Sequence, residues 1–439
     1  MNLTLLAALG VIALIVLLFL GMNVGIAMLL VGVVGYFLAT DNITLALARL
    51  GTVPFTIAQN YSYVVIPLFC LMGEFTLQSG MSKGLYDCCA KWIGHFPGGL
   101  NLATIISNAL FGAICGSSSA AVATMGKLAM PECRRYKYDD AFTAATCSAG
   151  GTLSWLIPPS TGFIIYALTA GNLSVGRLFA AGIVPGIILM VAFMIATSIV
   201  CKLRPEVAPR GEKASMHDRV HSLLGLIPIV VLFSAVLGGM FSGIFSYTEA
   251  AAIGVLLAMG YTVLVRKMNF KDFCARCLSA MKSSIMVFQI MICAGVFGYF
   301  LTVTNLPKNL ATLISGLDVP RVVILFAMLV MYIIIGMFMD TLSVVILTIP
   351  IFAPIVTELG YDLIWFGVVI VLVMVLGTIT PPIGINLFIA AGLDKNIPIS
   401  GIMKSSVPYC IALLIVTILI IMVPDISTWL PNLMYGVPA

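Results

Sequence analysis

Charged residues are scarce in this sequence of 439 residues. Only 9% of the residues are Asp, Glu, Lys or Arg, whereas 61% are hydrophobic. A soluble domain carries about 25% charged residues, so the scarcity excludes an ordinary soluble protein. Uncharged runs, each near the roughly 20 residues that cross a bilayer, lie at 3–20, 24–39, 183–200 and 407–423. The sequence therefore predicts an all-α protein that crosses the lipid bilayer many times.

Motifs of enzymes, metal sites and ATP-driven motors are also missing. The three histidines lie in polar loops without an HExxH motif, and no GxxxxGK[ST] loop is present to hold ATP. Most of the eleven cysteines stand alone in apolar runs, where a small buried hydrophobe is the expected role. The one CxxC, Cys274 to Cys277, lacks a second pair or a histidine partner. The net charge of +5 is spread over short loops, so we expect neither an enzyme nor a nucleic-acid-binding protein.

Prolines recur at a fixed offset of 223 residues along the chain. A Tyr-Asp pair recurs in the same alignment. The matches are Pro131 with Pro354, Tyr138-Asp139 with Tyr361-Asp362, Pro158-Pro159 with Pro381-Pro382, and Pro185 with Pro408. They predict an internal duplication, with a first repeat at about 1–222 and a second at about 223–439.

The basic residues predict that the second repeat is inverted in the membrane. Segments 202–221 and 266–276 are both basic, and the positive-inside rule places them in the cytoplasm. The turn ECRRYKYD at 132–139 is basic, whereas its repeat partner IVTELGYD at 355–362 has no Lys or Arg. We also count an odd number of crossings between the two turns, which places them on opposite sides of the membrane. We expect about ten crossings, with both termini on the periplasmic side.

Each repeat contains a proline break inside an apolar stretch. Pro cannot donate a backbone hydrogen bond and disrupts a helix interior, and freed backbone groups in lipid must find partners or line a cavity. Paired breaks in an inverted repeat indicate a secondary transporter, although a simple turn between two short helices stays possible. The predicted parts of the first repeat are scaffold helices at about 1–80, a hairpin at about 98–131 and a broken helix at about 140–170. Those of the second are scaffold helices at about 223–305, a hairpin at about 322–355 and a broken helix at about 362–392.

Polar residues mark the tip of each predicted re-entrant hairpin. GSSSAA at 116–121 aligns with MDTLSV at 339–344, so Ser117 corresponds to Asp340. A carboxylate within the membrane costs at least about 2.5–3.5 kcal/mol and needs a partner. Because no Lys or Arg lies nearby in the sequence, a bound Na⁺ is a natural partner for Asp340. The alternative for GSSSAA is close helix packing through small residues.

Several of these motifs resemble one family of membrane proteins. GSSSAAVATMG, GTLSWLIPPSTGFIIYALTAG, MDTLSVVILTIPIFAPI and GTITPPIGINLFIAAGL are similar to the large membrane subunit of tripartite ATP-independent periplasmic (TRAP) transporters, the DctM type. The resemblance implies a multi-pass protein of the bacterial inner membrane that works as an Na⁺-driven elevator. It also implies a small membrane subunit, here expected as a separate chain, and a periplasmic binding protein. The implied cargo is an organic anion, such as sialic acid or a four-carbon dicarboxylate.

The resemblance also implies which residues form the sites, where this sequence supplies the motif. The predicted substrate-binding residues are Ser117, Ser118, Ser119, Pro159, Ser160, Thr380, Gly384 and Asn386. The predicted Na⁺ ligands are Gly116, Ser117, Thr152, Pro158, Asp340, Thr341, Ser343, Thr378 and Pro381. A channel, or a non-transporting scaffold subunit of a membrane complex, is the alternative function.

Overall fold

The computed structural model describes residues 3–171, 173–211, 213–315 and 319–436, and all regular structure in these ranges is helical. This confirms the predicted all-α class. Seven helices in the described ranges are long and apolar enough to cross a membrane, or up to eight when the bent pair 43–58 and 61–78 counts as one span. Four shorter apolar helices accompany them. The number of about ten crossings stays a prediction.

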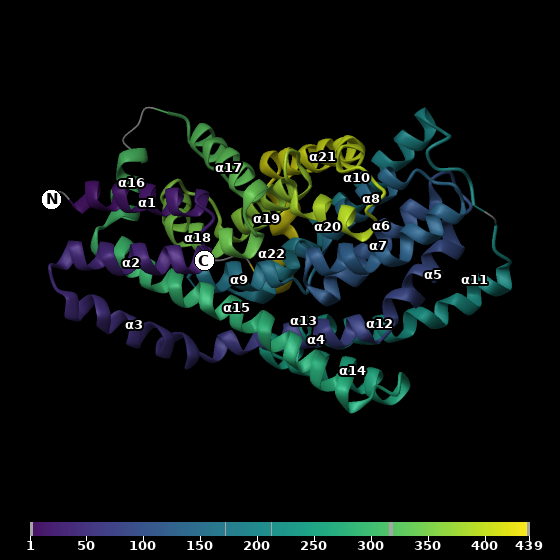
Figure 1. Cartoon of the computed structure of the whole chain (residues 1–439), viewed down its shortest axis with the longest axis horizontal. Coiled ribbons are helices and arrows are strands. Elements are labelled where there is room, and N and C mark those ends of the chain that lie inside the picture. Colours follow the sequence, from purple (N-terminus) through teal and green to yellow (C-terminus); the bar gives the residue numbers. More distant parts are fainter. Residues whose placement is uncertain (1–2, 172, 212, 316–318, 437–439) are drawn as a thin grey trace.

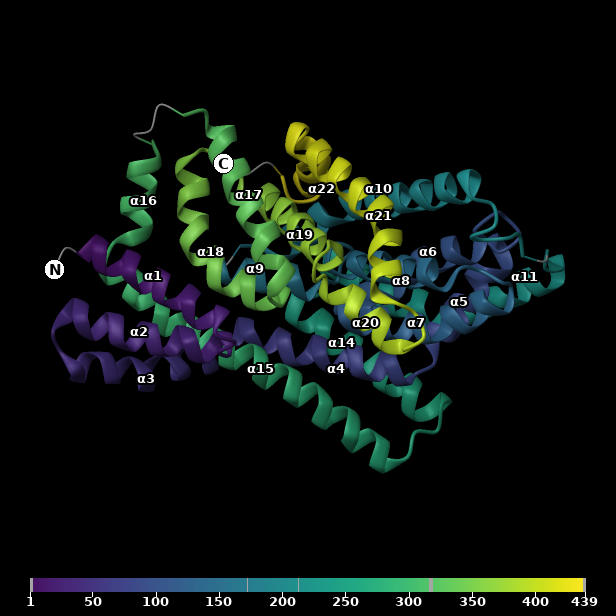
Figure 2. The ribbon, with the colours of Figure 1, turned by 45° about the horizontal axis from the view of Figure 1, so that its top comes forward.

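The first helices of each half pack together along one side of the molecule. Figures 1 and 2 show α2, α3 and α15 side by side at the end that holds the N-terminus, with α4 continuing along the same side. The helices concerned in the first half are α1 (Leu3–Phe19), α2 (Val24–Thr40), α3 (Ile43–Ala58), α4 (Val65–Gln78) and α5 (Met81–Ile93). In the second half they are α11 (Met216–Ser222), α12 (Ile227–Phe233), α13 (Gly239–Phe241), α14 (Tyr247–Gly260), α15 (Phe270–Val303) and α16 (Leu306–Ser315).

The remaining helices follow the 223-residue offset closely. The first set is α6 (Gly99–Cys115), α7 (Ser118–Arg135), α8 (Asp140–Thr152), α9 (Thr161–Thr169) and α10 (Val175–Leu203). The second set is α17 (Arg321–Phe338), α18 (Thr341–Glu358), α19 (Leu363–Ile379), α20 (Ile385–Leu393) and α21 (Ile399–Met422), followed by α22 (Asp425–Tyr435). Adding 223 to the bounds of α7 gives those of α18, and the starts of the other four pairs agree within one residue. The limits of the predicted repeats and their inverted orientation stay predictions.

The helix starts are fixed by equivalent capping residues in the two sets. Asp139 caps α8 by accepting a hydrogen bond from the Phe142 N–H at 2.7 Å, and Asp362 caps α19 through the N–H of Trp365 at 3.2 Å. A carboxylate there satisfies orphan N–H groups and favours the positive end of the helix dipole. This explains why the Asp of the Tyr-Asp pair recurs at the offset of 223.

Small residues bring α6 close to the turn that follows α8, and α17 close to α19. A Cβ built on Gly112 of α6 would lie 2.1 Å from Ser154 Oγ, and one on Gly377 of α19 would lie 2.8 Å from the carbonyl carbon of Gly336 in α17. Ser154 and Gly377 are themselves 223 residues apart. Close backbone approach through small residues is a common way to pack helices without a water-driven hydrophobic term.

The helices that precede the two proline pairs, α8 and α19, are almost entirely buried. All residues of α8 from Phe142 to Thr152 and all of α19 from Trp365 to Ile379 are buried. The hydroxyl of Tyr409 in α21 lies 2.7 Å from Thr146 Oγ1 in α8 and 2.9 Å from Thr197 Oγ1 in α10. These contacts join the two halves into one core, which holds the interrupted helices in place.

Candidate functional site: the breaks between helices

The first break lies between α6 and α7 at Gly116 and Ser117. Gly116 has a left-handed backbone (φ 62°), and a Cβ there would approach Thr161 Cγ2 at 3.0 Å. The Ser117 hydroxyl caps α7 by accepting from the Ala120 N–H at 3.3 Å. The hydroxyl of Thr161, the first residue of α9, donates to the Gly116 carbonyl at 2.6 Å. The N-termini of α7 and α9 therefore meet at one point, where their dipoles both favour negative charge.

The second break lies between α17 and α18 at Met339 and Asp340. The Asp340 carboxylate caps α18 by accepting from the Leu342 N–H at 3.1 Å. Its side chain is exposed, whereas Thr341 and Ser343 are buried. None of the ion pairs in the described part of the chain includes Asp340. The carboxylate is thus accessible and has no basic side chain as partner.

The third break separates α19 from α20 and contains Pro381-Pro382. Gly384, the residue before α20, has a left-handed backbone (φ 62°), and a Cβ there would lie 3.1 Å from the Thr378 carbonyl oxygen. The Thr378 hydroxyl donates to the Val375 carbonyl at 2.7 Å. Glycine is therefore required at 384 by both the backbone angle and the space beside the end of α19.

Asn386 connects this break to the first hairpin. Its side-chain amide donates to Ser118 Oγ at 2.7 Å and to Thr378 Oγ1 at 3.3 Å, with a longer contact to the Ser148 carbonyl at 3.4 Å. The Ser148 hydroxyl in turn donates to the Asn386 carbonyl at 3.1 Å. All four residues are buried. Three predicted site residues from both halves, Ser118, Thr378 and Asn386, are thus assembled with Ser148 into one polar cluster.

A cavity of about 210 Å³, here called the tip cavity, lies beside the first break. One wall is formed by Gly116, Ser117 and Thr161, and Leu342 at the start of α18 also reaches it. The opposite wall comes from α4 and α15. The other lining residues are Ile66, Cys70, Gly73, Glu74, Leu77, Cys115, Ala120, Ile164, Ile165, Ser283, Met286 and Val287. The tip cavity therefore separates the hairpin tips from the helices on the side of the N-terminus.

Other predicted site residues lie apart from the tip cavity and make local contacts. Ser160 donates to the Trp155 carbonyl at 2.6 Å, Thr152 to the Ala149 carbonyl at 2.6 Å, and Thr380 to the Leu376 carbonyl at 2.6 Å. Ser119 is exposed and Pro158 and Pro159 are buried, whereas Pro381 is half-buried. Whether these residues contact ion or substrate stays a prediction.

Three residues at these sites are missing from the sequence prediction. Thr161 directly follows the predicted Ser160, and its hydroxyl next to the proline break was an available signal. Glu74 is an acidic residue in an apolar helix, which by itself indicates function in a membrane protein. Ser148 carries no such signal, because only the packing of α8 against α20 brings it to Asn386.

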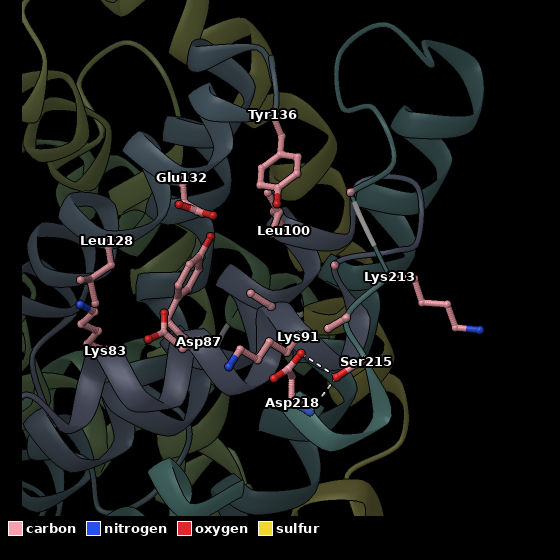
Figure 3. A pocket seen from close by; sticks show the side chains of 15 residues that line it. Lys83, Asp87, Lys91, Leu100, Leu128, Glu132, Tyr136, Lys213, Ser215 and Asp218 are labelled. Carbon is pink, nitrogen blue, oxygen red and sulfur yellow. Dashed lines mark hydrogen bonds between the residues drawn. The ribbon is translucent and has the colours of Figure 1, made fainter. Parts of the chain in front are cut away.

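A second, larger cavity of about 530 Å³ lies at the other end of α7 (Figure 3). It is bordered by Lys83 and Asp87 of α5, by Glu132 of α7, and by Gly211, Lys213, Ala214, Ser215 and Asp218. Dashed lines in Figure 3 join Ser215 and Asp218, whose side chains lie 2.6 Å apart. Its acidic and basic groups balance in number: Lys83, Lys91 and Lys213 against Asp87, Glu132 and Asp218. The larger cavity therefore has no net preference for an anion.

Apolar spans with paired internal breaks that meet around polar groups define the architecture of a secondary transporter. Comparison with known proteins agrees: the family "Tripartite ATP-independent periplasmic transporter, DctM component" matches residues 11–426. The chain belongs to this family. Members are large permease subunits of the inner membrane, not enzymes, and work with a small subunit and a periplasmic binding protein.

Two relatives and one solved structure illustrate the similarity. The chain is 33% identical to the C4-dicarboxylate TRAP transporter large permease protein DctM of Pseudomonas aeruginosa, covering 86% of this chain and 88% of the relative. It is 28% identical to the sialic acid TRAP transporter large permease protein SiaM of Vibrio cholerae, covering 96% and 97%. The fold is similar to that of the Alcanivorax borkumensis YdaH transporter, with a TM-score of 0.65 at 17% identity, covering 91% of this chain and 90% of that chain.

Proposed function

We propose that this chain imports an organic anion together with Na⁺ by moving its interrupted helices as one body against the helices beside the N-terminus. The main support for this proposal is the polar cluster that joins Ser118 of the first hairpin to Asn386 and Thr378 of the second broken helix. These residues come from both halves, so the elements around the breaks would move together. Carboxylates of the kinds carried by the relatives are the proposed cargo, delivered by a periplasmic binding protein.

The tip cavity is the proposed place for the anion. The N-termini of α7 and α9 converge on it, and the Ser117 and Thr161 side chains lie on its wall. N–H groups and dipoles at helix N-termini bind carboxylates without a basic side chain. The cavity also lies between the two groups of helices whose relative motion the proposal requires. A site between them is opened and closed by that motion.

Oxygen-rich helix breaks in the second half support Na⁺ as the second cargo. Asp340 offers an accessible carboxylate without a basic partner, and the carbonyl end of α19 at Thr378 lies beside Gly384. Carboxylate, hydroxyl and carbonyl oxygens are hard ligands that suit hard cations. The proposed Na⁺ ligands in the second half therefore stay Asp340, Thr341, Ser343, Thr378 and Pro381, and those in the first half stay Gly116, Ser117, Thr152 and Pro158.

The test is uptake of radiolabelled anion by proteoliposomes that contain the large and small subunits and the loaded binding protein. An inward Na⁺ gradient should drive accumulation above the external concentration, whereas an equal K⁺ gradient should not. A channel would only equilibrate the anion, and a scaffold subunit would give no uptake. The predicted separate small subunit is checked in the same assay by omitting it, which should abolish uptake.

A further inference from the structure

An apolar cavity of about 430 Å³, here called the α1–α17 slot, lies between the helices beside the N-terminus and the second hairpin. Its walls come mainly from α1, α16, α17 and α18, which Figures 1 and 2 show next to one another at the end that holds the N-terminus. Every side chain that lines it is apolar except Thr348, whose hydroxyl donates to the Val344 carbonyl at 2.6 Å. A buried water needs two to four polar partners, and the lining side chains offer only this engaged hydroxyl. The slot is therefore suited to hydrocarbon and not to water.

The slot opens toward the lipid. Its rim contains Ile15 and Phe19 of α1 and Ile334 and Phe338 of α17, all of which are exposed on the surface, whereas Leu14 of the lining is buried. The rings of Phe19 and Phe338 meet edge to face, with their centroids 6.3 Å apart. Since α17 is one of the helices that are long and apolar enough to cross a membrane, the exposed rim faces the acyl chains of the bilayer. A chain can therefore enter the slot sideways from the surrounding lipid.

The slot is too narrow for a helix of a partner protein. Its lining on α1 runs from Val11 to Phe19, which is about 12 Å at 1.5 Å per residue. A volume of 430 Å³ over that length gives an average width of about 6 Å, whereas a helix with its side chains is about 10–12 Å wide. An alkyl chain is thinner and can bend to follow the walls. Of the apolar groups present in a membrane, a lipid acyl chain fits this slot, whereas a helix of the small subunit does not.

The equivalent place in the first repeat is charged. The offset of 223 relates Leu306 and Leu310 of the slot to Lys83 and Asp87 of the larger cavity in Figure 3. Both cavities lie between equivalent helices, α5 and α7 in the first repeat and α16 and α18 in the second. The fold thus leaves a cavity at this place in both repeats, and only the side chains differ. This difference is expected if water fills the larger cavity and lipid fills the slot.

We propose that the acyl chain of a membrane phospholipid occupies the α1–α17 slot as a bound ligand. This goes beyond the proposed function and depends neither on Na⁺ nor on the anion site. The chain packs between α1 and the second hairpin, where the walls of an empty cavity would lack dispersion partners. Met339, which lines the slot, directly precedes Asp340. The bound chain therefore also supports the backbone that leads into the second break.

Photolabelling by a lipid tests the site. The complex of large and small subunits is placed in vesicles of phosphatidylethanolamine and phosphatidylglycerol that contain phosphatidylcholine with a diazirine near the end of one acyl chain. After illumination, mass spectrometry of the digested protein should find label on the buried lining residues Leu14 and Leu347 as well as on the exposed rim. Label confined to exposed residues such as Ile15 and Phe19 would overturn the proposal, because lipid would then touch only the surface. Cross-links from Leu347 to the small subunit would overturn it too.

Filling the slot with a larger side chain should expel the lipid. Val11→Trp places an indole within the slot, so most of the label on Leu347 should be lost. Val16→Trp is the matched control, because Val16 lies on the same helix but is exposed and does not line the slot; it should keep the native label. If Val11→Trp does not reach the membrane, Ile351→Trp on the opposite wall makes the same test. Undiminished label on Leu347 in a folded slot variant would show that the label does not come from a chain in the slot, and the proposal would fail.

Discussion

The side-chain amide of Asn386 lies 2.7 Å from the hydroxyl of Ser118, although 268 residues separate them. Both side chains are buried, and they belong to different halves of the chain. The contact links the start of α20, just after Pro381-Pro382, to the first turn of α7. The two sets of interrupted helices are thereby held in one fixed arrangement around the proposed sites.

Replacing Asn386 by Ala should destabilise the protein and reduce uptake. The change leaves Ser118 Oγ and Thr378 Oγ1 without their amide donor in a buried place, which costs about 1–3 kcal/mol. Thermal unfolding of Asn386→Ala, Ser118→Ala and the double variant measures the coupling, expected at about 0.5–3 kcal/mol for residues in contact. Asn432→Ala in α22 is the control. Strictly additive effects of the two changes would show that the contact contributes nothing.

Asp340→Asn should weaken the Na⁺ dependence of uptake far more than it lowers the amount of protein in the membrane. The amide keeps the volume and the cap on α18 but removes the only formal charge at this break. We expect a higher Na⁺ concentration for half-maximal uptake, measured in proteoliposomes at varied external Na⁺. Asp362→Asn, which changes the cap of α19, controls for loss of a capping carboxylate. Native Na⁺ dependence in Asp340→Asn would exclude this residue as a ligand.

Replacing Pro381 and Pro382 together by Ala should let α19 continue toward α20. Ala is the strongest helix former, so the carbonyl groups at the end of α19 would pair within the helix and withdraw from the ion. Ion binding to the folded state raises stability by mass action. The double variant should therefore lose most of its Na⁺-dependent shift in Tm, while the Tm without Na⁺ stays equal or rises. A full Na⁺ shift would indicate that the prolines form only a turn.

Arg134→Ala should lower the Tm more than Arg135→Ala. Arg134 at the end of α7 pairs with Asp140 at 2.8 Å and with Asp394 after α20 at 2.5 Å, whereas Arg135 makes one 3.6 Å pair within its own helix. Because half of the Arg134 side chain is exposed, the difference should be modest and should shrink at high salt.

Acidic pH should remove the difference in Tm between Arg134→Ala and Arg135→Ala. The Asn396 N–H and the Arg134 guanidinium lower the pKa of Asp394 below its usual value. A lowered pKa contributes stability above the ordinary carboxylate range near 3.9, and this is lost as the pH falls through the lowered value. Unfolding of both arginine variants from neutral to acidic pH should show the Tm values converging. A difference that persists in acid would contradict an ionic origin.

The local chemistry of the helix breaks could be read from the sequence. The consecutive prolines Pro381-Pro382 followed by Gly384 strongly disfavour a continuous helix, and Asp340 and Ser117 are typical capping residues, so the breaks at these positions follow from residue type. The offset of 223 made the pairing visible, because equivalent caps and prolines recur in register.

The contacts between distant segments could not be read in this way. Asn386 and Ser118, or Glu74 and Arg276, meet only because whole helices pack, and nothing in the residues beside them specifies the partner. Arg276 illustrates the difficulty. Its place in the basic segment 266–276 predicts only a cytoplasmic position, whereas the structure pairs it with Glu74. Long-range contacts of this kind depend on the fold as a whole.

Na⁺-driven accumulation of an organic anion tests the central claim most directly. Proteoliposomes with the large and small subunits and a loaded binding protein are given an inward Na⁺ gradient, and internal anion is followed over time. The account predicts accumulation above the external concentration that collapses when Na⁺ is equalised and that is strongly reduced in Asp340→Asn. Uptake that only reaches the external concentration, or that is the same with K⁺ as with Na⁺, would contradict it.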